Sequence, residues 1–174
     1  MGTAGDQAGF IAFAQSRRAP LVRAAWLMCH DHGLAEDLVQ EALTKLAAKW
    51  HRVGDQAPEA YVRRILYRDL IRARRAGSAV WLVEGHEDRP SLATSDHAST
   101  VVERANLVAA LQQLAPRQRA VIVLRYFEDL SVPQCAEALG ISEGTVKSQT
   151  HDGVRALRAL LGDRIQEDSA GGEE

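Results

Sequence analysis

The stretch that decides the fold is Leu130–Leu161, which reads LSVPQCAEALGISEGTVKSQTHDGVRALRALL. Ser131 and Gln134 are spaced as in a capping box, where each side chain accepts the backbone N–H of the other at a helix start. Gly140 suits the left-handed position that follows a helix end. Ser142 is then a good N-cap for another helix. The stretch therefore predicts two helices joined by a short turn.

The second of these helices places its side chains on two faces. One face is suited to burial, with a spacing of three and four: Val146, Thr150, Val154, Leu157 and Leu161. The other face is basic: Lys147, His151, Arg155 and Arg158. A short turn makes the two helices cross steeply, and a basic exposed face on the second is what a reader of the DNA major groove needs. The alternative is a helical hairpin whose charged face is merely solvated.

Composition limits the class of protein. The chain has 174 residues, 46% hydrophobic and 25% charged, as in ordinary soluble domains, and alternating β patterns are scarce. We therefore expect an all-α fold. No apolar run approaches the ~20 residues of a membrane span, and the N-terminus MGTAGDQAGF does not resemble a secretory signal. We expect a cytoplasmic protein without membrane insertion. The net charge of −2 predicts weak affinity for DNA, so another molecule should bring the chain to its site.

Neither a metal site nor a catalytic motif is expected. The run Cys29–His32 contains metal-binding side chains, but consecutive helical residues point in different directions and no second Cys/His group completes a tetrahedral site. Cys29 and Cys135 should be unpaired, as is usual in a reducing compartment. The sequence has no Gly-rich phosphate loop, HExxH motif or Ser/His/Asp grouping. We expect no cofactor and no catalytic activity.

The N-terminal half begins with two helical segments. Residues 10–32 should form a helix that Pro20 kinks or divides and that Gly33 ends. Ala35–Trp50 is the clearest amphipathic helix of this half. Its exposed face combines acidic, amide and other polar side chains: Asp37, Gln40, Glu41, Thr44 and Lys45. On composition alone such a face is more often solvated than bound to a partner.

An arginine-rich helix follows, PEAYVRRILYRDLIRARRA, at residues 58–76. Its arginines fall within thirteen positions: Arg63, Arg64, Arg68, Arg72, Arg74 and Arg75. Tyr61 and Tyr67 lie among them. Basic side chains interleaved with aromatic ones suit a nucleic-acid surface, since they contact phosphates and stack on bases. The alternative is an arginine face that forms salt bridges with the acidic helix before it.

The periodic pattern fails between about Gly77 and Thr100, which predicts a flexible linker between two small helical domains. We assign 10–76 to the first domain, 77–102 to the linker, 103–162 to the second domain and 163–174 to a frayed acidic tail. In the second domain Val101–Leu114 should be a helix, and Pro116 should begin the next. The side chains expected to face inward in the first of these helices are Val102, Leu107, Ala110, Leu111 and Leu114. Those expected to support the helix-turn-helix are Val121, Leu124 and Tyr126–Phe127.

With both halves described, the chain resembles bacterial RNA polymerase sigma factors of the extracytoplasmic-function type, which keep only regions two and four. AEDLVQEALTKLAAKW resembles the acidic helix of region two, and the arginine-rich helix follows at the expected place. LAPRQRAVIVLRYFEDLSVPQCAEALGISEGTVKSQTH is a specific match to region four. The resemblance covers roughly residues 10–76 and 103–161.

The resemblance implies partners and roles. It implies binding to core RNA polymerase, through the beta-prime coiled coil and the beta flap, and to promoter DNA, while catalysis belongs to the polymerase. Core-binding residues would be Asp37, Gln40 and Glu41. Residues at the −10 element would be Arg63, Arg64, Tyr67, Arg68, Arg72 and Arg75, together with the loop His51–Pro58. Residues at the −35 element would be Ser142, Glu143, Lys147, Ser148, His151 and Arg155.

Two features depart from the family's pattern. Arg68 stands where many relatives have Asn, and Gln149, Asp152 and Gly153 make the second helix of the pair less basic than usual. The sequence leaves open the promoter, the inducing signal and whether an anti-sigma factor binds the chain. A rival hypothesis is a helix-turn-helix regulator that binds duplex DNA as a dimer without polymerase. The acidic helix followed by an arginine-rich helix argues against it.

Overall fold

The computed structural model describes the backbone of residues 4–76 and 98–170, and the side chains of residues 5–73 and 102–162. Across these ranges the chain is helical and contains no strand, which confirms the all-α expectation. Most of the expected linker, residues 77–97, lies outside the described residues.

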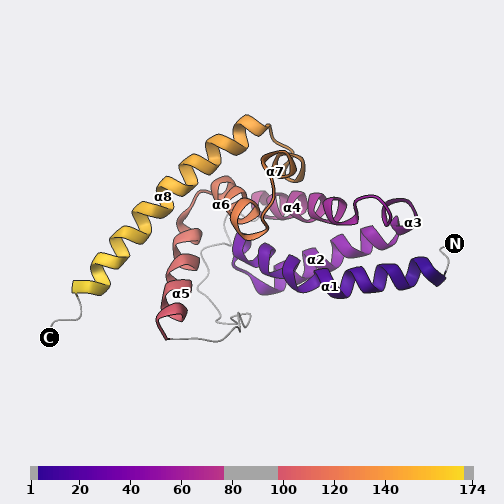
Figure 1. Cartoon of the computed structure of the whole chain (residues 1–174), viewed down its shortest axis with the longest axis horizontal. Helices are drawn as coiled ribbons and strands as arrows, with labels where there is room; N and C mark the ends of the chain where they lie inside the picture. The colour runs from indigo at the N-terminus through magenta and orange to yellow at the C-terminus, as the bar shows by residue number, and fades with distance from the viewer. Residues whose placement is uncertain (1–3, 77–97, 171–174) are drawn as a thin grey trace.

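The N-terminal half packs three long helices side by side (Figure 1). Its elements are α1 (Ala4–Cys29), α2 (His32–Ala47), the short α3 (Trp50–Val53) and α4 (Pro58–Ala76). Apolar side chains at helical spacing in α2 and α4, such as Val39, Leu46, Val62 and Leu66, are fully buried between them. The hydrophobic effect of this burial holds the acidic face of α2 and the arginine row of α4 in fixed positions.

Pro20 does not divide the first helix. α1 continues through it as one element, although a proline inside a helix removes a hydrogen bond and costs about 3 kcal/mol. The residues that follow, Leu21, Ala24, Ala25 and Met28, are almost wholly buried. Their burial contributes roughly 1.5–3 kcal/mol for each large side chain, which offsets the cost of the proline.

The break after α1 lies earlier than expected. α1 ends at Cys29, His30 adopts a left-handed conformation with φ of 58°, and Asp31 caps α2 by accepting the backbone N–H of Leu34 at 2.9 Å. Gly33 lies within the first turn of α2, so the prediction that Gly33 ends the helix was wrong. A strong N-cap residue fixed the boundary, and a helix tolerates one glycine at a cost of about 1 kcal/mol.

The C-terminal half contains the predicted helix pair. Its elements are α5 (Ala98–Gln113), α6 (Pro116–Ile122), the π-helical turn η1 (Val123–Phe127), α7 (Val132–Leu139) and α8 (Glu143–Ala170). α8 continues through Gly162 to Ala170, into the segment assigned to the acidic tail. One glycine does not end a helix whose other residues favour it.

Some side chains expected inside this half lie on its surface. Val102 and Leu107 of α5 and Tyr126 and Phe127 of η1 are exposed, Tyr126 to 64%. In η1 the backbone closes a wider turn, because the N–H of Glu128 bonds the carbonyl of Val123, and the extra residue rotates the aromatic pair outward. The predicted inward orientation of Val102 and Leu107 was wrong, and the aromatic pair expected to support the helix-turn-helix is exposed.

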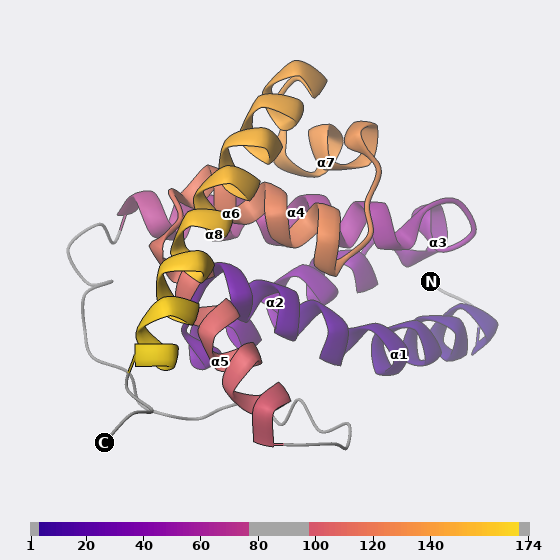
Figure 2. The same cartoon turned by 60° about the vertical axis from the view of Figure 1, so that its left-hand side comes forward.

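The two halves share one hydrophobic core. Buried side chains from both halves belong to it, such as Met28 and Leu66 from the first and Leu124 and Leu130 from the second. α7 packs against α4, and α1 contacts α5, α6 and η1. Figures 1 and 2 both show α7 beside α4, while α8 extends away from the N-terminal half. The halves are therefore packed together in this structure.

Candidate nucleic-acid interface

The turn between α7 and α8 has the geometry that its sequence predicts. The Ser131 N–H donates to the Gln134 side-chain oxygen at 2.8 Å, and the Gln134 N–H donates to the Ser131 hydroxyl at 3.4 Å, which completes the capping box. Gly140 adopts φ of 65°, the left-handed conformation that favours glycine. The Ser142 hydroxyl accepts the Thr145 N–H at 3.1 Å. These local bonds fix the crossing of α7 and α8 as a helix-turn-helix.

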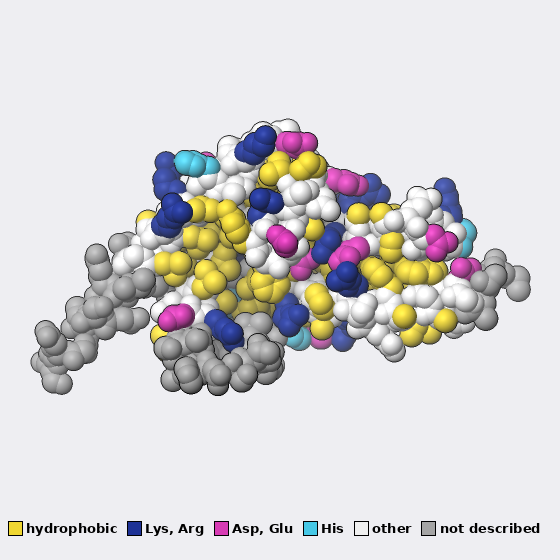
Figure 3. All heavy atoms as spheres, in the orientation of Figure 1, with side chains coloured by type: hydrophobic (Ala, Val, Ile, Leu, Met, Phe, Trp, Pro, Cys, Tyr) yellow, Lys and Arg dark blue, Asp and Glu magenta, His cyan; other side chains and the backbone are white. Residues whose placement is uncertain are grey.

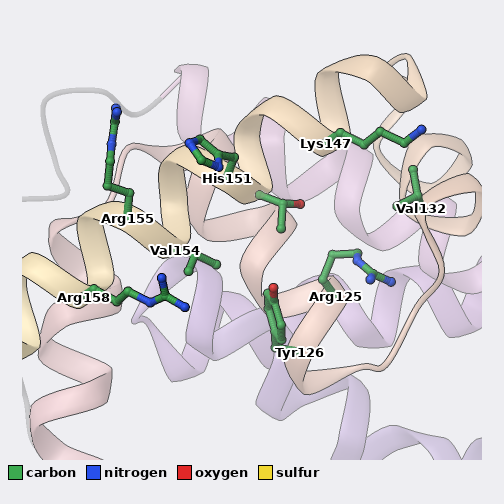
Figure 4. A pocket seen from close by; sticks show the side chains of 9 residues that line it. Arg125, Tyr126, Val132, Lys147, His151, Val154, Arg155 and Arg158 are labelled. Carbon is green, nitrogen blue, oxygen red and sulfur yellow. The ribbon is translucent and has the colours of Figure 1, made fainter.

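α8 presents its two faces as predicted. Val146 is fully buried against the core, and Thr150, Val154, Leu157 and Leu161 are partly buried. The −35 candidates are all exposed: Ser142, Glu143, Lys147, Ser148, His151 and Arg155. In Figure 4 Lys147, His151 and Arg155 point to the outer side of α8, whereas Val154 points inward. The structure therefore brings these candidates together on one open helical face.

A groove extends this basic face toward η1. Its lining is basic and partly apolar: Arg125, Tyr126, Val132, Lys147, Thr150, His151, Val154, Arg155 and Arg158. Tyr126 faces α8 from η1 across the groove (Figure 4). Figure 3 shows Lys, Arg and His side chains along the edge formed by α8, with hydrophobic side chains below them. The sequence pattern did not predict that Arg125 and Tyr126 line this groove, because the π-helical turn that exposes Tyr126 has no simple sequence signal.

The arginine row of α4 is only partly open. Arg64, Arg68 and Arg72 are exposed, and Arg64 lies over the Tyr61 ring at 5.8 Å. Arg63 is mostly buried, since it pairs with Glu59 and with Glu128, each at 2.9 Å. The side chain of Arg75 lies outside the described residues.

Tyr67 is the −10 candidate whose position differs most from the prediction. Its ring is fully buried, and burial, with the nearby Glu128 carboxylate, raises its pKa well above the ordinary value. In this arrangement Tyr67 cannot touch DNA. The open −10 face among the described side chains is therefore Arg64, Arg68 and Arg72.

Among the described side chains, the arginines of α4 form no ion pair with the acidic helix α2. In the part of the chain with described side chains, the ion pair that joins α2 to α4 is Lys45–Asp69 at 2.9 Å, with no arginine of α4 taking part in such a link. Arg68 and Arg72 instead lie near Asp69 of their own helix, at 3.9 and 3.6 Å. Exposed pairs of this kind are worth little, so these two arginines remain available to a polyanion.

The acidic face of α2 lies apart from the arginine row. Asp37, Gln40 and Glu41 are exposed at helical spacing, opposite the buried Leu38, Val39, Ala42, Leu43 and Leu46. Glu41 pairs with Lys45 at 2.7 Å, while Gln40 offers its carbonyl to the Thr44 hydroxyl at 2.8 Å. The three side chains form one open polar surface that a protein partner could reach.

The cysteines and the possible metal ligands form no further site among the described residues. The Cys29 thiol donates to the Asp31 carbonyl at 3.2 Å, and both cysteines are free and buried. Burial raises the pKa of each thiol to about 11. Over the described ranges, no three His, Cys, Asp or Glu side chains are grouped to hold a metal ion, and no helix is long and apolar enough to cross a membrane.

An exposed basic helix in a helix-turn-helix, in a chain that has a second helix with a partly open arginine row, is typical of an all-α DNA-binding protein. Family models described as Sigma-70 region 2 and Sigma-70, region 4 match residues 13–79 and 104–157. The RNA polymerase sigma-E factor of Streptomyces avermitilis is 34% identical over 92% of this chain and 89% of its own length. The ECF RNA polymerase sigma factor SigL of Mycobacterium tuberculosis is 36% identical, over 86% of this chain and 87% of its own.

Two solved structures have the same fold. The sigma factor RpoE, in complex with the anti-sigma factor NepR from Bartonella quintana, superposes with a TM-score of 0.66 over 88% of this chain and 96% of its own, at 25% identity. CnrH in complex with the cytosolic domain of CnrY gives 0.66 over 90% of both chains, at 21% identity. The chain belongs to the sigma-70 family of RNA polymerase sigma factors, in its extracytoplasmic-function group.

Proposed function

We propose that this chain binds core RNA polymerase in the cytoplasm, directs it to specific promoters through the −35 and −10 elements and helps to open the DNA. The observation that carries this proposal is the presence, in one chain of this family, of two separate basic helical faces, one on α8 and one on α4. The rival, a regulator that acts without polymerase, has no use for the second face or for the region that bears it.

The face of α8 is proposed to read the −35 element. Six exposed side chains from the first four turns of α8 and its N-cap are available to the major groove: Ser142, Glu143, Lys147, Ser148, His151 and Arg155. Contacts to base edges in that groove are worth about 1–3 kcal/mol each, and the basic side chains add phosphate contacts. Arg158, Arg125 and Tyr126 extend the surface along the groove.

The face of α4 is proposed to bind the −10 element. Arg64, Arg68 and Arg72 are open to phosphates, and the exposed arginines can stack on unpaired bases. Extruding a base from duplex DNA costs a few kcal/mol. A cationic surface that stacks and neutralises the separated strand offsets that cost.

The acidic face of α2 is proposed to bind the beta-prime coiled coil, with the beta flap contacted by the C-terminal half. Asp37, Gln40 and Glu41 form this open surface. With the chain fixed on the polymerase, the second DNA contact becomes intramolecular, and weak readers gain from effective concentration. RpoE was captured with the anti-sigma factor NepR, which makes an anti-sigma factor a candidate partner here.

Run-off transcription with purified core polymerase on a promoter library tests the function. We expect the chain to make core initiate at a subset of promoters, and scrambling either the −35 or the −10 element to abolish the transcript. No stimulation of core on any promoter, or equal transcription from scrambled templates, would show that the chain is not a promoter-specific factor.

A further inference from the structure

The loop that joins α2 to α4 is folded around one tryptophan, Trp50, at the start of α3. The N–H of Gly54 donates to the Trp50 carbonyl at 2.7 Å, which closes the turn. A Cβ on Gly54 would lie 2.7 Å from Cε2 of the Trp50 indole and 2.9 Å from the Trp50 carbonyl oxygen. These distances are too short for a real side chain, so the loop folds over the indole only because position 54 is a glycine.

The N-terminal part of α1 packs against the same indole. The Phe10 ring meets it edge to face, with centroids 5.6 Å apart and an angle of 73° between the planes. The Phe13 ring is also at 5.6 Å, tilted by 47°. Aromatic rings favour such arrangements. Figures 1 and 2 both show α3 next to the N-terminal end of α1. We call Phe10, Phe13 and Trp50 the aromatic clamp.

The loop has one face against the protein and another face in solvent. Val53 packs against the hydrophobic core, as the clamp does. A base that has left the duplex stack exposes its Watson–Crick edge, which hydrogen-bond donors and acceptors can read. The exposed side chains of the loop provide both kinds of group: His51, Arg52, Asp55 and Gln56.

We propose that the aromatic clamp is a positioning element for −10 recognition. Phe10 and Phe13 fix Trp50, and Trp50 together with Gly54 fixes the loop, so that its exposed polar side chains meet an unpaired base in one arrangement. The proposal rests on the −10 role proposed for the N-terminal half. The Sigma-70 region 2 match begins at residue 13, so Phe10 lies before the matched part of the chain.

A fixed loop matters most for discrimination between bases. Discrimination is a difference between two affinities, and hydrogen bonds select one base only when the groups that form them are held in place. A loop that moves freely must be ordered when it captures a base, which weakens capture. It also adapts more easily to an incorrect base. Loosening the clamp should therefore reduce the preference for the correct −10 base, whereas the −35 candidates lie on another helix, α8.

The test uses the full chain with core polymerase and templates that differ at single −10 or −35 positions. Run-off transcription then gives two ratios, the preference for the best −10 base and the preference for the best −35 base. Phe10→Ala should lower the −10 preference about tenfold, since one base contact is worth ~1–3 kcal/mol, and leave the −35 preference unchanged. Ile11→Ala, at the exposed next position of α1, is the matched control. Phe10→Tyr retains the ring and should retain both preferences.

A second pair of variants loosens the clamp from the side of the loop. Gly54→Ala places a methyl group against the indole, whereas a Cβ at Gly162 meets nothing within 4 Å, so Gly162→Ala is its control. This pair decides the question if Phe10→Ala does not fold, which circular dichroism would reveal. Hydrogen–deuterium exchange of the free chain should be faster at the loop amides in Phe10→Ala and Gly54→Ala than in the two controls.

A clamp that only stabilises the fold predicts a different result. Transcription would then fall by one factor on all templates, and loss of both preferences or of neither would overturn the proposal. Equal exchange of the loop amides in Phe10→Ala and Ile11→Ala would show that the clamp does not hold the loop. If the wild-type chain itself had no preference for any −10 base, the proposed function would be contradicted, not the clamp alone.

Discussion

The helices α4 and α8 are alike in sequence and unlike in exposure. Each has basic side chains at helical spacing, and each buries its apolar side. On α8 the basic face is open from Lys147 to Arg158, whereas on α4 the other half covers Arg63 and Tyr67. The two proposed DNA-binding faces, which the charge pattern alone would treat as equal, are therefore not equally exposed in this structure.

The difference in exposure between α4 and α8 determines which proposed DNA contact is restricted in this structure. Covering α8 would prevent the first contact with duplex DNA, which phosphate attraction drives. On the proposed roles, covering an edge of α4 would affect only the later contact with the separated strand. A chain of net charge −2 that hides part of one cationic face also has less attraction for nucleic acid at random sites.

The largest effect should come from removing the buried guanidinium that joins the two halves. Arg119→Ala would leave the carbonyls of Met28, Gln112 and Leu114 without this donor. We expect the free energy of unfolding to fall by about 3 kcal/mol or more, since each unsatisfied buried group costs roughly 1–3 kcal/mol. Urea denaturation measures it. Arg117→Ala, at an exposed site two residues away, should change it by less than about 0.5 kcal/mol, and equal losses would refute the network.

The next effect should come from the surface of α2 that is proposed to bind core polymerase. Asp37→Lys combined with Glu41→Lys should weaken core binding by on the order of tenfold to a hundredfold, because like charges across an interface cost several kcal/mol. The fold should be intact, since both side chains are exposed. Surface plasmon resonance with immobilised core would measure the affinity. Glu103→Lys with Glu137→Lys is the matched control, and an equal loss there would contradict the assignment.

Single substitutions in the two proposed DNA-binding faces should separate their roles. Lys147→Ala or Arg155→Ala should lower transcription about tenfold, from contacts worth ~1–3 kcal/mol, and reduce the salt slope of duplex binding by about one. Arg64→Ala or Arg72→Ala should leave duplex binding near wild type and reduce permanganate reactivity of the opened strand. Core affinity should be unchanged in all four. If the α8 substitutions impaired strand opening and the α4 substitutions impaired duplex binding, the two proposed roles would be refuted.

The smallest effect should be on the pH dependence of stability, through His30 at the end of α1. Partial burial, and then the positive charge of Arg119, lower the pKa of His30 below its ordinary value of about 6.5. The unfolded chain therefore binds a proton more readily, and the contribution of neutral His30 to stability is complete above about pH 6.5 and is lost as pH falls below it. His30→Asn, which tolerates the left-handed backbone, should reduce the loss in thermal midpoint between pH 7.5 and 5.5. An unchanged loss would show that His30 has no part in it.

The predictable parts of the molecule were local ones. The capping box at Ser131, the left-handed Gly140 and the two faces of α8 follow from neighbours within a few residues, and all three are present. The exposure of Arg64 and Arg68 likewise follows from helical spacing against a buried Leu66.

The parts that were missed depend on contacts between distant segments. Nothing near Tyr67 in the sequence indicates that α7 packs on this part of α4. Arg63 and Arg64 are adjacent in the sequence, yet Arg63 is mostly buried and Arg64 is exposed, because consecutive residues point in different directions around a helix. Gly153 looked like a gap in a basic face, but a Cβ there would lie 2.9 Å from Ile122, so the glycine lets α8 approach α6. Tyr126 points outward because of the π-helical turn, which hydrophobic periodicity cannot predict.

The most direct test compares what core polymerase adds to each reader. Binding of a −35 duplex and of a single-stranded −10 oligonucleotide, both taken from a promoter found by run-off transcription, would be measured by fluorescence anisotropy for the free chain and for the holoenzyme. Because the α4 face is partly covered in the free chain and the α8 face is open, the gain on joining core should be at least about tenfold larger for the −10 strand. Equal gains, or a larger gain for the −35 duplex, would contradict this account.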